Sequence, residues 1–441
     1  MSRPPVPAMI IAAPGSNSGK TTVTLALLRA FAKSGINVSS FKTGPDYIDP
    51  AFHHRASGRA CFNLDPWAMR PQTLRHIWEN VTTDSDLVIG EGVMGLFDGA
   101  ADGSGSTADL AEFLDIPIIL VVNAKGQAAS VGALLHGFNS YRKSSRLAGV
   151  IFNAVGSANH VAMLKATAEQ VGVPYLGAIP KSDQLTLPRR HLGLVQAQEN
   201  TELDNFLDQA ADIIAAHVDL AKLQSLATTS RIKPGTEISA TAPGQHIAIA
   251  KDAAFAFCYP HQIATWQKAG AQISYFSPLL DQAPDGAADF IYLPGGYPEL
   301  HADSLARAHN FKTALCAAAH KKVGIFGECG GYMVLGQTLT DKTGIAHPMS
   351  GLLPIHTSFE HPKLHLGYRQ AKLAGPCALG FAGTRFSAHE FHYASVIGTE
   401  GSAPLFSLKN ATNDDLGASG AISGSVCGSF VHLIDKAYDD D

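Results

Sequence analysis

Two loops, each joining a buried strand to a helix, constrain what this chain of 441 residues can fold into. The first loop, PGSNSGKTT at residues 14–22, follows the apolar run 9–13. The second, GECGG at residues 327–331, follows the apolar run 323–326. A glycine-rich loop ahead of a Lys-Thr pair is typical of phosphate binding, and a thiol between glycines is typical of a nucleophile at a sharp turn. The sequence therefore indicates two chemistries, one that spends ATP and one that forms a thioester.

The composition indicates an ordinary globular protein and excludes several other classes. The net charge is −5 and no basic tract is present, so nucleic acid is not expected as a partner. No apolar run is long enough to cross a bilayer, and the first residues do not resemble a signal peptide. The six cysteines contain no C-x-x-C pair, which argues against a zinc or disulfide framework. We expect a cytoplasmic protein with no membrane partner, and the sequence leaves open a homo-oligomer.

Apolar strand-like runs alternate with helical stretches in both halves of the chain. In the first half the expected strands are 9–13, 38–42, 86–90, 116–123 and 149–153. In the second half they are 246–251, 290–293, 323–326 and 425–432. This alternation predicts mostly parallel sheets that bind ligands at the carboxyl ends of their strands.

A stretch rich in Thr, Ser, Pro and Gly separates the two halves and is typical of a linker. We therefore expect an α/β fold with an ATP-binding P-loop domain over residues 1–222, a linker over 223–244 and a second α/β domain over 245–441.

The first loop has the residue types that nucleotide binding requires. Its spacing is G-x-x-x-G-K-T, with Pro14 where the full motif has a further glycine. Backbone N–H groups and the helix N-terminus bind phosphate oxygens, Lys20 reaches the terminal phosphates, and the Thr21 hydroxyl can bind Mg²⁺. The expected nucleotide-binding residues are Gly15, Ser16, Asn17, Ser18, Gly19, Lys20, Thr21 and Thr22.

Acidic residues at the ends of two predicted strands complete a site for Mg²⁺, which prefers oxygen ligands. Asp46 follows the second strand, and Glu91 follows a later one. Their proline, glycine and apolar neighbours indicate buried, fixed loops. We therefore expect metal binding by Thr21, Asp46 and Glu91. Three further residues are candidates for substrate contact, with turn formation as the alternative for the two aspartates: Tyr47, Asp49 and Asp98.

The second loop places Cys329 at the foot of a predicted helix, where the helix dipole favours a thiolate. The backbone N–H of Gly330 is positioned for an oxyanion hole. A second N–H can come from the loop at residues 293–299, at Gly296. The alternative for Cys329 is a buried structural thiol.

A thiol nucleophile needs a base, and His432 at the end of the predicted last strand is our candidate. His389 and His392 lie in the segment HEFHY, which lacks the helical i, i+4 spacing of a zinc protease. On a strand these two histidines would face opposite sides. We therefore expect that segment to be structural or to contact substrate.

Taken together, these motifs resemble known families over nearly the whole chain. Cys329 within ECGG, the loop PGGYPE at residues 294–299 and the late His432 resemble a class I glutamine amidotransferase domain. The N-terminal half resembles the dethiobiotin-synthetase-like ATPases. Several segments resemble the corrin a,c-diamide synthases of cobalamin biosynthesis: 44–50, 63–67, 91–99, 190–194 and 389–393. Within that family, segments 56–59 and 65–71 are more similar to the enzymes that act on hydrogenobyrinate.

The resemblance implies amidation of the a and c acetate groups of a corrin polycarboxylate, with ATP, Mg²⁺ and L-glutamine as the other reactants. It implies that Cys329 attacks the glutamine carboxamide, that His432 moves the proton, and that ATP activates the corrin carboxylate. Class I amidotransferases carry Glu two residues after the histidine, but this chain has Ile434 there, which implies a Cys–His dyad. Asp435 should face the other side of the strand.

Other activities remain open at this point. The related enzymes are a cobyrinate a,c-diamide synthase acting on the cobalt-bearing ring, a nickel-sirohydrochlorin a,c-diamide synthase and a cobyric acid synthase. A different class is a P-loop switch ATPase of the partitioning type, in which Cys329 would have no role.

Overall fold

The computed structural model describes residues 5–187, 189–190, 193–194, 196–197, 201–232, 241–399 and 401–437. The chain divides into two compact units. The first unit comprises residues 1–67 and 71–237, and the second comprises residues 68–70 and 238–441. None of the helices among the described residues is both long and apolar enough to cross a membrane.

The first unit is built on a parallel sheet in the order β3-β2-β4-β1-β5-β6-β7, with β10 added antiparallel to β1. All the strands expected in the first half are present, with small shifts at their ends. The strands are β1 Pro7–Ala12, β2 Val38–Thr43, β3 Cys61–Leu64, β4 Leu87–Glu91, β5 Ile118–Asn123, β6 Leu147–Val155, β7 Tyr175–Pro180 and β10 Thr228–Thr229. A short hairpin pairs β8 Arg189–Arg190 with β9 Gly193–Leu194.

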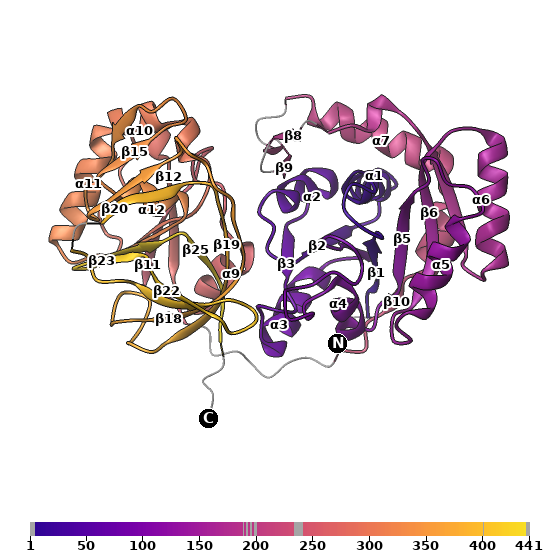
Figure 1. The fold of residues 1–441 in the computed structure, drawn as a ribbon, viewed down its shortest axis with the longest axis horizontal. Coiled ribbons are helices and arrows are strands. Elements are labelled where there is room, and N and C mark those ends of the chain that lie inside the picture. Colours follow the sequence, from indigo (N-terminus) through magenta and orange to yellow (C-terminus); the bar gives the residue numbers. More distant parts are fainter. Residues whose placement is uncertain are drawn as a thin grey trace. The chain divides into compact units, whose positions relative to one another are not determined.

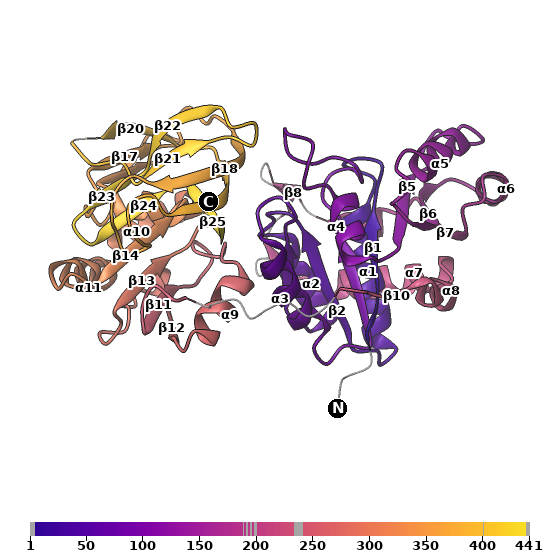
Figure 2. The same cartoon turned by 90° about the horizontal axis from the view of Figure 1, so that it is seen from below.

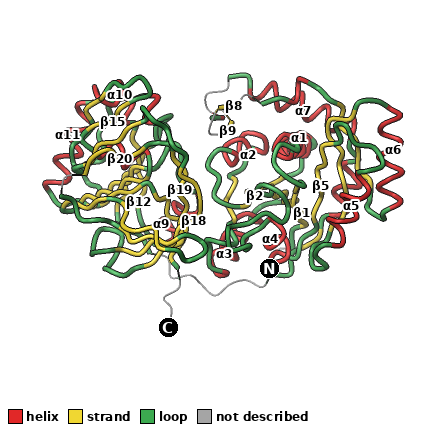
Figure 3. Tube along the Cα trace, viewed as in Figure 1, coloured by secondary structure: helices red, strands yellow, loops and turns green. Residues whose placement is uncertain are grey.

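Helices cover both faces of this sheet, as Figures 1 and 3 show. On one face α1, α2 and α7 pack together, and α3 and α4 lie on the other. The apolar side chains of Ile11, Ile89 and Val121 are buried beneath the α1 face. The helices are α1 Lys20–Lys33, α2 Asp49–Ser57, α3 Pro71–Thr82, α4 Thr107–Leu114, α5 Val131–Ser140, α6 Ala158–Gln170, α7 Leu203–His217 and α8 Leu220–Leu226, with a 3₁₀ turn at Asp183–Leu185.

The expected linker at 223–244 starts inside the first unit. Helix α8 continues to Leu226, and Thr228 and Thr229 then pair with Ala8 and Pro7 of β1. Residues 233–240 of that stretch lie outside the described residues.

In the second unit, a central sheet packs against helices on one side and against an antiparallel sheet on the other. The central sheet has the order β12-β11-β13-β14-β24-β23, and the five-stranded antiparallel sheet has the order β22-β21-β18-β19-β25. Figure 2 separates the part that contains β11, β12 and α9 from the part that contains β17, β20 and β22. The central strands are β11 His246–Ala250, β12 Gln272–Phe276, β13 Phe290–Leu293, β14 Gly324–Glu328, β23 Ala421–Ser423 and β24 Val426–Ser429.

The remaining elements surround this central sheet. The other strands are β15 Thr338–Thr340, β16 Ala346–Pro348, β17 Ile355–Ser358, β18 His365–Leu373, β19 Arg385–His392, β20 Ser395–Thr399, β21 Phe406–Lys409, β22 Asp415–Ser419 and β25 Val431–Lys436. The helices are α9 Pro260–Lys268, α10 Ala302–Arg307, α11 His309–His320 and α12 Gly330–Leu335, with 3₁₀ turns at Pro278–Leu280 and Pro298–Leu300.

Two apolar cores hold the layers of the second unit together. Ile291 and Ile325 of the central sheet pack against Leu305, Phe311 and Leu315 of the helices. On the opposite side of the sheet, Tyr292 and Phe326 share a second core with residues of the antiparallel sheet. Successive residues of a strand point to opposite faces, so β13 and β14 contribute alternately to both cores.

The single strand expected at 425–432 is wrong, because the chain changes sheets there. β24 pairs with β14 in the central sheet, whereas β25 pairs with β19 in the antiparallel sheet. The Ser429 hydroxyl accepts the Val431 N–H (3.0 Å), so this donor does not continue the first ladder. Phe430, the residue between the two strands, packs edge-on against Tyr332. His432 is therefore the second residue of β25 and does not end the last strand.

A prediction concerns Gly90, whose place in the first sheet is filled by a neighbouring ring. Phe41 and Gly90 are partners on β2 and β4, and a Cβ on Gly90 would lie 2.0 Å from Phe41 Cζ. We expect Gly90→Ala to lower the free energy of unfolding by about 1–3 kcal/mol through overpacking. Urea unfolding followed by tryptophan fluorescence measures this, because Trp78, one of the three tryptophans, contacts Phe41 (centroids 5.9 Å apart).

A second substitution is the control for this prediction. Phe41→Leu in the Gly90→Ala background should recover part of the lost stability, because it removes the ring that clashes. Simple additivity of the two losses would contradict the packing explanation.

Candidate functional site

Two residues with positive φ and a hydrogen bond from a neighbouring strand fix the conformation of the phosphate loop between β1 and α1. Asn17 and Gly19 have φ values of +64° and +88°. The Ser18 hydroxyl donates to the Gly15 carbonyl (2.8 Å), and the Asn153 amide of β6 donates to the Ser18 carbonyl (3.1 Å). A Cβ on Gly19 would lie 2.1 Å from Asn153 Nδ2, so glycine is required there. The first turn of α1 carries no acidic residue, and the loop fits an anion at this helix N-terminus.

Lys20 points from this loop toward the segment after β4. Its ammonium donates to the Met94 carbonyl (2.9 Å). Burial and the nearby Lys42 charge lower the pKa of Lys20 to about 8, although Glu91 and Asp49 act in the opposite direction. The loop at 91–99 therefore lies against the phosphate loop, as expected if both contact the same nucleotide.

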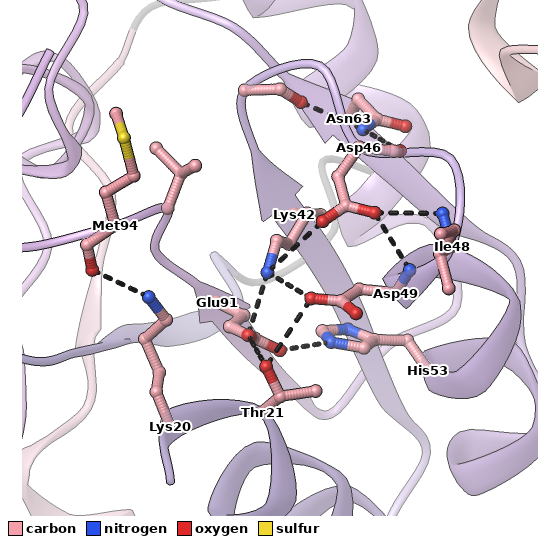
Figure 4. A network of polar contacts seen from close by, with 12 residues as sticks. Lys20, Thr21, Lys42, Asp46, Ile48, Asp49, His53, Asn63, Glu91 and Met94 are labelled. Carbon is pink, nitrogen blue, oxygen red and sulfur yellow. Dashed lines mark hydrogen bonds and ion pairs between the residues drawn. The ribbon is translucent and has the colours of Figure 1, made fainter. Parts of the chain in front are cut away.

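Lys42, at the end of β2, lies at the centre of a buried acidic cluster (Figure 4). Its Nζ is 2.5 Å from Asp49 Oδ2, 2.8 Å from Glu91 Oε1 and 3.7 Å from Asp46 Oδ2. Burial disfavours the ammonium, but Asp49 and Glu91 raise the pKa of Lys42 well above its usual range. The Thr21 hydroxyl donates to Glu91 Oε1 (2.6 Å), which ties the phosphate loop to the cluster.

Glu91 has a second cationic partner in His53 of α2. Nε2 of His53 lies 2.7 Å from Glu91 Oε2, and both side chains are fully buried. Burial favours the neutral forms of both groups. However, Cys61 and Glu91 raise the pKa of His53 to about 10. Lys42 and His53 likewise hold the pKa of Glu91 below its usual range, so the charged pair is favoured.

The structure brings together most of the acidic residues expected in the first unit. Thr21, Asp46, Asp49 and Glu91 surround Lys42, so Asp49 belongs to the cluster and is more than a turn residue. Asp46 Oδ1 also accepts the backbone N–H groups that begin α2. Burial and Asp46 raise the pKa of Asp49 to about 7.

Asp98 and Tyr47 show different environments from these four residues. Asp98 Oδ2 accepts the Gly95 N–H (2.9 Å), and the Asp98 N–H donates to the Gly95 carbonyl (3.1 Å). Asp98 therefore stabilises a turn, which was the alternative to substrate contact. Tyr47 is half-buried in the loop between β2 and α2. Substrate contact remains a prediction for both residues.

Sequence reasoning missed Lys42 and His53. Lys42 immediately precedes Thr43-Gly44-Pro45-Asp46 at the carboxyl end of β2, where polar residues of a parallel sheet meet ligands. That position at the end of a strand could have identified Lys42. No feature of the sequence could have identified His53, because it lies inside α2 among other polar residues.

Cys329 forms the sharp turn that its glycine neighbours predict, between β14 and α12. It has φ +46° and ψ −99°, and its N–H donates to the Ser429 carbonyl (2.8 Å). A Cβ on Gly331 would lie 1.9 Å from the Leu293 carbonyl oxygen, which explains the requirement for a small residue. A left-handed non-glycine residue is strained, and such strain is common at nucleophiles.

The loop 293–299 passes directly over Cys329 and His432. A Cβ on Gly295 would lie 2.5 Å from His432 Cε1 and 3.4 Å from Cys329 Cβ. A Cβ on Gly330 would lie 3.0 Å from the Gly296 nitrogen, so the two proposed oxyanion donors belong to adjoining backbone segments. Their role as an oxyanion hole remains a prediction.

Cys329 and His432 interact as a buried pair. Burial lowers the pKa of His432, but Cys329 and Glu328 outweigh it and raise that pKa to about 10. The pKa shift therefore favours the protonated, charged form of His432 beside Cys329. Glu328, immediately before the nucleophile, was not predicted from the sequence.

The other two histidines lie on opposite faces of β19, as expected. His389 pairs directly with His432 across the strands, and burial together with the His432 charge lowers the pKa of His389 to about 3. His392 Nε2 lies 2.9 Å from Glu390 Oε1, and its ring stacks on Phe430 (centroids 3.9 Å apart). His392 thus has a packing role, and His389 is a neutral neighbour of the catalytic candidate.

The fold and the two sites define a class of protein: a P-loop unit joined to a unit with a thiol nucleophile at an elbow. Family models match both parts. Residues 9–195 match the CobQ/CobB/MinD/ParA nucleotide binding domain, and residues 246–439 match the CobB/CobQ-like glutamine amidotransferase domain.

Curated relatives align over almost the whole chain. The hydrogenobyrinate a,c-diamide synthase of Brucella abortus biovar 1 is 51% identical over 437 residues, which cover 97% of this chain and 98% of the relative. Those of Rhodobacter capsulatus and Rhizobium meliloti are 49% and 48% identical, each over 97% of this chain and over 98% and 99% of the relative, respectively. The chain belongs to the hydrogenobyrinate a,c-diamide synthase family.

A prediction follows from the close approach of Gly295 to the imidazole. Gly295→Ala should displace the buried His432 ring, because the added Cβ would lie only 2.5 Å from its Cε1 atom. Since misplacing a catalytic group by about 1 Å can cost about 10²-fold in rate, we expect a loss of that order in glutaminase kcat. Steady-state glutamate release measures it.

Gly286→Ala is the matched control, because a Cβ there meets nothing within 4 Å. It should leave glutamate release unchanged. Glutaminase activity of Gly295→Ala within twofold of wild type would show that the loop does not constrain His432.

Proposed function

We propose that this protein converts hydrogenobyrinate to its a,c-diamide, with glutamine as the nitrogen donor and ATP as the activating co-substrate. The observation that carries the proposal is one chain with both an elbow thiol and a P-loop, 51% identical over 97% of its length to a hydrogenobyrinate a,c-diamide synthase. A P-loop switch ATPase of the partitioning type has no use for a glutamine amidotransferase domain.

In the second unit, the thiolate of Cys329 attacks the δ-carbonyl carbon of glutamine, and the C–N bond breaks. His432 gives its proton to the departing nitrogen, which leaves as ammonia. The N–H groups of Gly296 and Gly330 are the proposed donors to the oxyanion. Water, with His432 as base, then hydrolyses the glutamyl thioester to glutamate and restores the thiol.

In the first unit, a corrin acetate oxygen attacks the γ-phosphorus of ATP and ADP leaves. A carboxylate does not react with ammonia directly because oxide is a poor leaving group, whereas the acyl phosphate loses phosphate readily. Lys20 supplies positive charge beside the transferring phosphoryl group. Ammonia displaces phosphate to give the amide, and the reaction occurs twice, once on each acetate.

The first unit also suits the Mg²⁺ that accompanies ATP. Among the described residues, no group of three or more acidic, His or Cys side chains is arranged to hold a metal ion by itself, and Lys42 already neutralises the acidic cluster. Mg²⁺ commonly takes one or two protein oxygens and completes its shell with phosphates and water. We therefore assign Thr21 and Glu91 as its protein ligands, with Asp46 close by, and the ion would neutralise phosphate charge there.

The proposal predicts that ammonium can replace glutamine as the nitrogen source when the glutaminase site is inactive. Cys329→Ala should abolish glutamine-dependent amidation, because no thioester forms. It should retain amidation with a high concentration of ammonium chloride, because the first unit still activates the carboxylate. Diamide formation followed by chromatography with each nitrogen source measures this; equal loss with both would make Cys329 structural.

Lys20→Ala is the complementary control. It removes the charge beside the phosphates, so amidation should fail with glutamine and with ammonium alike, while Cys329 alkylation continues at the wild-type rate. Near-normal ammonium-dependent turnover of Lys20→Ala would show that ATP binds at another site.

The choice of substrate provides a further prediction. With metal-free hydrogenobyrinate and cobalt-bearing cobyrinate supplied side by side, we expect a clear preference in kcat/KM for the metal-free ring, as the names of the relatives suggest. Equal or greater turnover of the cobalt-bearing ring would contradict this substrate while leaving the amidation chemistry intact.

A further inference from the structure

Glu328 is the last residue of β14 and immediately precedes the nucleophile. Its carboxylate is almost fully buried, with its side chain 2% exposed. The Tyr292 hydroxyl donates to Oε2 (2.6 Å) and the Leu433 N–H donates to Oε1 (3.0 Å). The same Oε2 lies 3.7 Å from Nδ1 of His432. The carboxylate is therefore held through both oxygens while it faces the imidazole.

The fold determines this arrangement through three neighbouring strands. Phe326 pairs with Tyr292 across β14 and β13, and Glu328 lies two residues further along, on the same face of the sheet. Leu433 is the residue after His432 on β25, so its N–H ties the carboxylate to the backbone that carries the imidazole. One carboxylate thus connects the nucleophile strand to the histidine strand.

The two positions after His432 where an acidic partner would be expected do not provide one. Residue 434, where class I amidotransferases carry Glu, is a buried isoleucine. Asp435 forms two hydrogen bonds with the Arg70 guanidinium, which belongs to the same unit (3.1 and 2.8 Å).

The other groups around the pair do not compete for this role. His432 also faces His389, whose pKa is lowered by burial, and Glu328 also faces Cys258 and Tyr292. Burial, with Glu328 as the next cause, raises the pKa of both the Cys258 thiol and the Tyr292 hydroxyl. Both are therefore neutral at working pH and leave Glu328 facing the imidazole.

We propose that Glu328 is the positioning residue of the glutaminase site: it orients His432 through Nδ1 and stabilises its protonated form. The proposal rests on the glutaminase half of the proposed function. With the Nδ1–H directed at the carboxylate, Nε2 is the nitrogen left to accept the Cys329 proton and return it to the departing ammonia. A separation of 3.7 Å is long for a hydrogen bond, but catalytic bonds often shorten when substrate is bound.

The test is Glu328→Gln, which keeps the shape and removes the charge. We expect glutaminase kcat to fall on the order of 10²-fold, with the KM for glutamine changed less than threefold. Amidation with ammonium chloride should be unchanged, which shows that the protein is folded. The pH midpoint of Cys329 alkylation by iodoacetamide should rise, because the imidazolium that stabilises the thiolate is weakened.

Glu390→Gln is the matched control, because Glu390 is a partly buried carboxylate of the same unit that pairs with Arg369 and His392 and not with His432. It should leave glutaminase kcat and the alkylation midpoint unchanged. If Glu328→Gln keeps glutaminase activity within threefold while His432→Ala abolishes it, Glu328 is a packing residue and the proposed function stands. If His432→Ala is also fully active, the glutaminase assignment itself fails.

A measurement on the wild-type protein decides the matter even if Glu328→Gln does not fold. In ¹⁵N-histidine NMR spectra of the full chain, the His432 resonances are those missing from His432→Ala. We expect His432 Nδ1 to carry a proton throughout the active pH range. An unprotonated Nδ1 would overturn the proposal.

Discussion

Buried charge that must be paired is the constraint on which both sites depend. Lys42 is almost fully buried and persists as an ammonium because Asp49 and Glu91 lie within hydrogen-bond distance of it. His432 and Glu328 form the corresponding pair in the second unit. Removing one partner of a buried ion pair typically costs about 3–5 kcal/mol, because the other charge is left uncompensated. Each site is therefore a network in which the members depend on one another.

The parallel sheets explain why these networks form where they do. Lys42 is the second-last residue of β2, and it pairs in register with Glu91, the last residue of β4. Glu328 ends β14, beside Tyr292 of β13. Carboxyl ends of parallel strands meet at one edge, and the loops that follow need not continue a ladder. Such an edge can therefore hold polar groups that the apolar strand interiors could not accommodate.

Local patterns in the sequence were sufficient for the parts of the structure that short segments determine. The phosphate loop, the elbow at Cys329 and the opposite faces of His389 and His392 follow from the conformational freedom of glycine and from strand alternation. The break at Phe430 was missed because residues 425–432, SVCGSFVH, contain no proline or charged residue that would mark the end of a strand. A change of sheet depends instead on which strands are available as partners. Position along the chain likewise could not show that Glu328 faces His432.

The sequence by itself determined the α/β class, the two chemistries and the identities of Lys20, Thr21, Asp46, Glu91 and Cys329 as candidates, because their motifs are continuous in the chain. The tertiary structure decided which separate segments meet: Lys42 with Asp49 and Glu91, and Glu328 with His432. The physical reason is that a motif encodes local backbone geometry, whereas an ion pair between strands depends on sheet order and register. Long-range contacts set both, and no short stretch of sequence contains them.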